Sequence, residues 1–336
     1  DHSLLHVIEG RLHLARADRQ RDGTGQTDRA LLSEAITAFN DALRLDRESG
    51  VAWLGLARTK RLISDYEGAQ EDIARALRLL PSEDPSAASE AALLALDLRD
   101  LSAASKHIEA AAIHGNSATV HYVRGNIATQ NGSLDKALMH YDEALTSDPS
   151  HIRARMNRSG ILLALNEGRK VLDDCEILLD LAPSLVLARF RRAEGFMHLS
   201  EWENARDDLK MVLESSPHHY QALTKLGACY LSLKRPERAE GPLNEAIRLN
   251  PNHAPAWHQR GLLYLDLKEP DAAFDDFQAA IRCDGNHLDS RLHIAGALHH
   301  QERHAEAAAA WRAVLAIDPD SRVARTRLEH CEINLA

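Results

Sequence analysis

Histidine is the residue type in this chain with the clearest capacity for chemistry, because imidazole nitrogens bind metals and transfer protons. The 336 residues include 19 histidines. His300 and His304 have the i,i+4 spacing at which one helix can present two imidazoles to a metal ion, and so do His2 and His6. However, the segment 300–304 reads as a turn between two helices, and no cysteine lies near either pair in the sequence. We therefore predict packed or solvated histidines, no metal site and no cofactor.

Sequence signatures of common catalytic sites are absent. The chain has no GxxxxGK[ST] phosphate loop, no GxGxxG, no GxSxG elbow and no HExxH motif. We therefore predict that the protein is not an enzyme and has no catalytic residue.

Composition narrows the class of protein further. The net charge of −10 argues against nucleic acid as the main partner, because phosphate binding requires a basic surface. No stretch approaches 18 consecutive apolar residues, so we predict no membrane span and a water-soluble protein. The four cysteines form no CxxC motif; as free thiols they favour a reducing compartment such as the cytoplasm.

The whole arrangement of the chain follows from a period of 34 residues. A proline or glycine closes each unit at that interval, at Pro81, Gly115, Pro149, Pro183, Pro217, Pro251, Gly285 and Pro319. The units are 50–83, 84–117, 118–151, 152–185, 186–219, 220–253, 254–287 and 288–321. Positions below are counted within this frame.

Two helices are predicted in each unit. Positions 4, 7, 8 and 11 lie on one helical face, and positions 20, 24 and 27 lie on one face of a second helix. Position 8 is always small, at Ala57, Ala91, Gly125, Ser159, Ala193, Gly227, Gly261 and Ala295. Small side chains let two helix backbones approach closely. A single pair of about 14-residue helices cannot bury its apolar face, so we predict that the pairs stack into an all-α solenoid.

The two ends depart from the period. Residues 1–49 read as a degenerate first repeat, in which Ala35, Phe39 and Ala42 match positions 20, 24 and 27. Its first helix is expected over residues 3–18, followed by an inserted mobile loop at 22–28. Residues 50–321 form eight repeats, and residues 322–336 are expected to form a C-terminal capping helix. The prediction is thus about nine helix pairs and a cap.

One unit carries the pattern of a known family. Trp257, Gly261, Tyr264, Ala273, Phe277 and Ala280 reproduce the W…G..Y…A…F..A pattern, and the chain from about residue 30 to residue 321 resembles the tetratricopeptide repeat family. The resemblance implies a right-handed superhelix whose concave wall is made mainly by the first helices. It also implies that positions 2, 5, 6, 9, 12 and 13 point into a concave groove.

At these groove positions Asn126, Asn157 and Arg191 look like part of the carboxylate clamp of chaperone-binding family members. Amides donate to a carboxylate, and a guanidinium binds it in a fork. Two lysines of the family clamp are replaced here by Tyr122 and Leu187. Arg153 and Lys225 could partly replace their charge. The predicted peptide-binding residues are therefore Tyr122, Asn126, Arg153, Asn157, Arg191 and Lys225.

Charge is divided unequally between the predicted helices. The four central first helices, within residues 118–233, carry a net charge of +7, and their four partner second helices, within 132–249, carry −7. A basic inner wall would attract an anionic segment. The alternative is that the arginines at position 7 pack their stems between helices: Arg124, Arg158, Arg192 and Arg260.

The sequence favours a non-catalytic scaffold or adaptor that binds an acidic segment, or a C-terminal carboxylate, of a partner protein in its groove. Two alternatives remain open. The groove could pack on another subunit, in a larger assembly or a homo-oligomer, or on the chain's own N-terminal segment. The repeats could also be the regulatory region of a larger enzyme.

Overall fold

The computed structural model describes residues 2–24, 28–81, 84–113 and 115–335, which form nineteen helices and no strand. The prediction of an all-α repeat solenoid is confirmed. The chain divides into two compact units, residues 1–195 (unit 1) and 196–336 (unit 2), with the boundary inside a helix. Among the described helices, none combines the length and apolar character needed to cross a bilayer.

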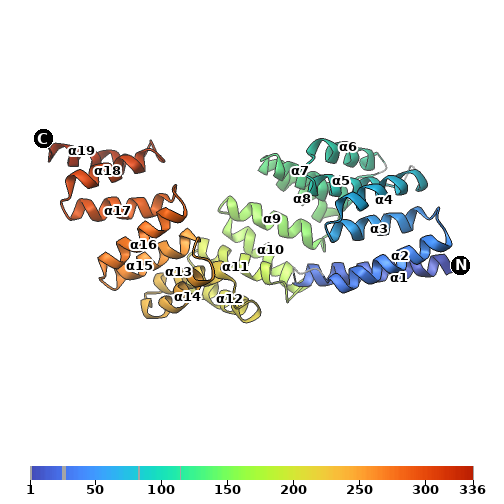
Figure 1. The fold of residues 1–336 in the computed structure, drawn as a ribbon, viewed down its shortest axis with the longest axis horizontal. Coiled ribbons are helices and arrows are strands. Elements are labelled where there is room, and N and C mark those ends of the chain that lie inside the picture. The colour runs from blue at the N-terminus through green and yellow to red at the C-terminus, as the bar shows by residue number, and fades with distance from the viewer. Residues whose placement is uncertain (1, 25–27, 82–83, 114, 336) are drawn as a thin grey trace. The chain divides into compact units, whose positions relative to one another are not determined.

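The helices alternate in the order predicted from the period (Figure 1). Those up to the boundary are α1 (His2–Thr24), α2 (Arg29–Leu45), α3 (Gly50–Leu62), α4 (Tyr66–Leu79), α5 (Ser86–Asp97), α6 (Leu101–Ala112), α7 (Ala118–Gln130), α8 (Leu134–Ser147), α9 (Ile152–Ala164), α10 (Gly168–Leu181) and α11 (Val186–His198). Those of the second half are α12 (Trp202–Ser215), α13 (Tyr220–Ser232), α14 (Pro236–Leu249), α15 (Ala254–Asp266), α16 (Pro270–Cys283), α17 (Leu288–His300), α18 (His304–Leu315) and α19 (Arg322–Ile333).

The contact between the two helices of a repeat depends on a small residue facing a large one. A Cβ added to Gly125 would lie 2.5 Å from the Tyr141 ring, and one added to Gly261 would lie 2.6 Å from the Phe277 ring. Both rings are almost fully buried. Position 8 is therefore small because the residue at position 24 fills the space that a side chain would need.

Neighbouring repeats share their apolar cores. Ala104, Ile108 and Ala111 of α6 belong to one buried cluster with Val120 and Val123 of α7, the first helix of the next repeat. Each second helix thus packs against both its own partner and the following repeat. This is expected, because a single helix pair cannot bury its apolar face without a neighbour.

The turn inside each repeat contains one residue in the left-handed conformation. These residues have φ between 58° and 71° and recur at intervals of 33 to 35 residues: Ser64, Arg99, Gly132, Asn166, Ser200, Lys234, Lys268 and Glu302. The next N–H returns to a carbonyl of the first helix, as Glu167 N does to Leu162 O at 2.9 Å. This six-to-one bond is a Schellman helix end. Only one of the eight residues is glycine, so the sequence signals the turn weakly.

The N-terminal helix is longer than predicted. α1 continues to Thr24 instead of ending at residue 18, so residues 22–24 are helical and not part of a loop. Residues 25–27 of the predicted loop lie outside the described residues, and Asp28 caps α2 by accepting from the N–H groups of Ala30 and Leu31. The loop was inferred because this segment lacks an apolar anchor. The contact nearest to this segment is electrostatic and lies before it, where Asp18 contacts two arginines, as described below.

The packing at position 8 gives a matched pair of glycine variants. Gly261→Val should lower the free energy of unfolding by about 2 kcal/mol, because the new side chain overlaps Phe277. Gly296→Ala should raise it by about 0.5–1 kcal/mol, because its added Cβ meets no atom within 4 Å and alanine favours the helix. Urea denaturation of both variants tests this. Equal effects of the two substitutions would contradict the account of position 8.

Candidate functional site

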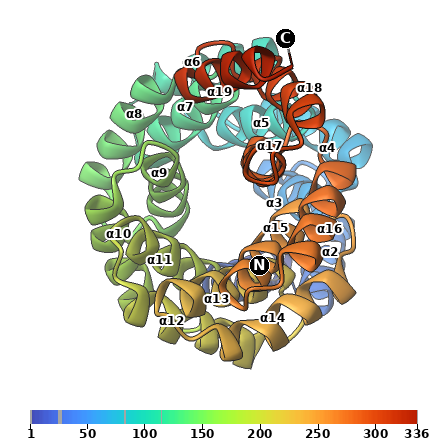
Figure 2. The ribbon, with the colours of Figure 1, turned by 90° about the vertical axis from the view of Figure 1, so that its left-hand side faces the viewer.

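Five of the six predicted binding residues line one cavity of unit 1. The cavity has a volume of about 680 Å³, and its lining includes Tyr122, Asn126, Arg153, Asn157 and Arg191. They come from the first helices α7, α9 and α11. Within unit 1, Figure 2 shows α9 on the inner side of the curve and α10 on the outer side. The sixth residue, Lys225, is on α13 in unit 2.

The two asparagines are hydrogen-bonded to each other and share contacts with a buried tyrosine. Asn126 Oδ1 accepts from the hydroxyl of Tyr141 at 2.8 Å and from Asn157 Nδ2 at 2.9 Å. Asn157 Nδ2 also lies 3.4 Å from that hydroxyl. These contacts use the donors of Asn157, whereas the N–H groups of Asn126 take no part in them. Asn157 therefore orients Asn126, which is the better placed of the two to donate to a ligand.

Arg191 lies against the backbone of α9. Its Nη1 donates to the carbonyl of Met156 and to Ser159 Oγ, the latter at 3.1 Å. Gly160 allows this approach, because an added Cβ there would lie 3.1 Å from that Nη1. Among the described residues, no carboxylate is paired with Arg191. Loss of water on burial lowers the pKa of Arg191, with Cys175 and Glu194 opposing the shift.

Arg153 already holds a carboxylate. Its Nη2 lies 2.8 Å from one oxygen of Asp18, and Nη2 of Arg58 lies 2.5 Å from the other. Asp18 comes from α1, Arg58 from α3 and Arg153 from α9, so the contact joins segments far apart in the sequence. The Asp18 side chain is only 16% exposed. These three residues line a second cavity of about 520 Å³, which shares Arg153 and Tyr122 with the first.

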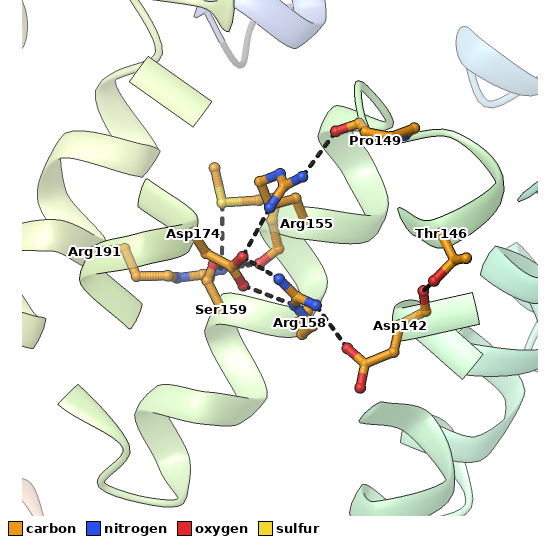
Figure 3. A network of polar contacts seen from close by, with 9 residues as sticks. Asp142, Thr146, Pro149, Arg155, Arg158, Ser159, Asp174 and Arg191 are labelled. Carbon is orange, nitrogen blue, oxygen red and sulfur yellow. Dashed lines mark hydrogen bonds and ion pairs between the residues drawn. The ribbon is translucent and has the colours of Figure 1, made fainter. Parts of the chain in front are cut away.

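Other arginines of the first helices are neutralised inside the array. Arg158 and Arg155 both bind the carboxylate of Asp174, whose side chain is 2% exposed, and Arg158 also binds Asp142 at 2.6 Å (Figure 3). Arg260 pairs with Asp276 in the same way, at 2.7 Å. Pairing with these carboxylates raises the pKa of Arg158 and of Arg260, against the opposing effect of burial. The excess positive charge of the first helices is thus only partly available to a ligand.

Asp18 and Arg58 were not among the residues predicted to line the groove. Arg58 occupies position 9 of its repeat, the same groove position as Asn126, so reading the groove positions in every repeat would have found it. No local signal marks Asp18, because its contact depends on the curvature that brings α1 and α9 together.

Models of the tetratricopeptide repeat match the chain in several places. One matches residues 89–152, 243–287 and 258–322, and another matches residues 197–260. Together the matches cover more than half of the chain. The chain belongs to the tetratricopeptide repeat family.

Solved structures of tetratricopeptide repeat proteins show the same fold. The chain is 18% identical to one from Parabacteroides merdae, with a TM-score of 0.51 over 73% of this chain and 97% of that one. It is 14% identical to a chain of the APC/C hetero-tetramer Cut9–Hcn1, with a TM-score of 0.56 over 97% of this chain and 89% of that one. No curated protein sequence matches. As a tetratricopeptide repeat protein the chain is a protein-interaction scaffold of a generally non-catalytic family.

Asp174 and Asp142 give a matched pair of variants around one arginine. Asp174→Asn should lower the free energy of unfolding by about 3 kcal/mol, because it leaves Arg155 and Arg158 without a buried counter-charge. Asp142→Asn should cost under about 1 kcal/mol, because Asp142 is 60% exposed. Denaturant unfolding of the two variants measures the difference. A cost for Asp174→Asn as small as that of Asp142→Asn would show that the buried pair is dispensable.

Proposed function

We propose that the inner face of unit 1 binds an acidic segment of a partner protein. The segment would lie along the two connected cavities, with one carboxylate on Arg191 and another on Arg153 and Arg58. Asn126 would donate an additional hydrogen bond, and Tyr122 would provide apolar contact. Tyr122 suits that role because its ring packs against the ring of His151, with 5.0 Å between the ring centroids, and is thereby held in place.

The observation that carries this proposal is the contact made by Asp18. A carboxylate presented by another part of the chain lies between two groove arginines with N–O distances of 2.5 and 2.8 Å. This is the geometry expected for a bound acidic side chain. The groove therefore accommodates a carboxylate at this point, and an incoming acidic segment would compete with Asp18 for it.

Arg191 supports a second carboxylate position. A guanidinium that has lost water and has no paired carboxylate among the described residues is energetically costly. Its hydrogen bonds go to neutral acceptors, and the charges of Cys175 and Glu194 offset its desolvation only in part. An anionic ligand would supply the missing charge. Because Arg191 lines the same cavity as Arg153, one extended segment can contact both.

Loss of the two arginines should weaken binding of an acidic peptide. The probe is a fluorescein-labelled peptide of glutamates that ends in a free carboxylate. Arg153→Ala with Arg191→Ala should weaken binding by about 2–4 kcal/mol, the sum of two charge-assisted contacts. Fluorescence anisotropy measures the affinity. Lys170→Ala, which removes a charge that is 62% exposed on the second helix α10, is the matched control.

Asp18→Asn in the same titration tests the competition. Removing its charge should strengthen binding several-fold, because Arg153 and Arg58 no longer hold an internal carboxylate. If the double arginine variant binds as tightly as Lys170→Ala, the groove is not the site. If only Asp18→Asn is without effect, the groove binds the peptide but Asp18 serves to anchor α1.

A further inference from the structure

Three potential metal ligands meet on the repeat formed by α7 and α8. They are His121 of α7 and His140 and Glu143 of α8, and their ligand atoms all lie within 4.8 Å of one another. Glu143 Oε2 is 2.8 Å from His121 Nδ1 and 2.9 Å from His140 Nδ1. This is the one such group of three found among the described residues. It lies apart from the proposed groove residues, because its members do not line either groove cavity.

The two histidines depart from what the other repeats hold at the same positions, whereas Glu143 is at position 26, where Glu109 and Glu245 also stand. His121 is at position 4, where Trp53, Arg155, Arg189, Trp257 and Arg291 donate to the backbone carbonyl six residues earlier. His121 instead faces the second helix of its own repeat. His121 thus does not make the hydrogen bond to the backbone that the position 4 side chains of five other repeats make.

His140 on α8 also breaks the pattern. His140 is at position 23, where four repeats have an aspartate: Asp72, Asp174, Asp208 and Asp276. Asp174 and Asp276 each pair with the arginine at position 7 of their own repeat. Here the arginine at position 7, Arg124, pairs with Glu109 of the preceding repeat, at 2.9 Å. The repeat has therefore replaced a structural ion pair with two imidazoles around one carboxylate.

The protein atoms alone do not satisfy this cluster. His121 Nδ1 is buried and has no hydrogen-bond partner of good geometry among the described residues, although Glu143 Oε2 lies 2.8 Å from it. A buried imidazole nitrogen without a directed partner is costly. A cation at the point shared by the three ligand atoms would satisfy this nitrogen.

We infer that His121, His140 and Glu143 form a binding site for a divalent transition metal ion of the zinc class. Two imidazole nitrogens and a carboxylate are a ligand set that zinc accepts, whereas magnesium and calcium prefer oxygen ligands alone. The ligand atoms require little movement, since tetrahedral ligands at about 2 Å from zinc stand roughly 3.3 Å apart. The ion would clamp the first helix of the repeat to the second.

Two of the three residues border the protein surface, so the proposed site is accessible from solvent. A surface cavity of about 640 Å³ is lined by His121 and Glu143 together with Asp142, Asp135 and Met139. Asp142 is the carboxylate nearest in sequence, but Arg158 binds it at 2.6 Å. The fourth ligand is therefore water or a side chain of a partner protein, so the site could hold a metal-bridged contact.

Zinc titration of the chelator-treated full chain tests the inference. Competition with a chromophoric zinc chelator should give one tight site, and His140→Ala with Glu143→Gln should weaken it at least about tenfold, since both are direct ligands. Substitution with Co²⁺ should give visible d–d absorption in the wild-type protein that this double variant lacks. Circular dichroism at 222 nm confirms that the variant is folded.

A second histidine group provides the control. His299 of unit 2 has Nδ1 3.2 Å from Cys331 Sγ and its ring 5.0 Å from His330. His299→Ala with His330→Ala should leave the tight zinc site and the cobalt spectrum unchanged. If this variant abolishes tight binding, or if His140→Ala with Glu143→Gln binds zinc as the wild type does, the inference is wrong. Should the double variant unfold, the single variant Glu143→Gln replaces it. Loss of the cobalt d–d absorption in that variant would support the site, and an unchanged spectrum would contradict it.

Discussion

The structure depends on the close approach of the two helices of a repeat, where a small residue at position 8 lies under the residue at position 24, which is large in most repeats. Gly125 under Tyr141 and Gly261 under Phe277 show how little space is left. That approach fixes the distance between the two helices of a repeat. Since each second helix also packs on the next repeat, the spacing is transmitted along the stack and places the groove positions of successive first helices side by side.

Charged residues are built on this framework in two different ways. Where position 23 is an aspartate, it can hold the arginine of position 7 inside the repeat, as Asp174 holds Arg158. Where the groove positions carry arginine, the charge faces a cavity and meets a carboxylate from elsewhere, as Arg153 meets Asp18. Position in the repeat therefore decides whether an arginine pairs within its own repeat or lines a groove cavity.

The periodic part of the molecule was predictable because each contact recurs. The 34-residue frame locates the small residues at position 8 and the turns between repeats. Together with the family resemblance it also gives the register of the groove positions, and this register is why five predicted residues share one cavity. The contact of Asp18 was not predictable, because it depends on long-range curvature. His121, His140 and Glu143 were not predicted because they come from two helices, although comparison of equal positions across repeats exposes the two histidines.

The central claim is that the two helices of a repeat are held together by the small residue at position 8 against the residue at position 24, and that support comes mainly from the neighbouring repeats. Native-state hydrogen exchange of the Phe277→Ala variant tests it most directly, because that substitution empties the space beside Gly261. The account predicts that protection falls most in α15 and α16, less in α14 and α17, and not at all in α1–α8. An equal loss of protection in every helix would contradict it, because the chain would then be one cooperative globule.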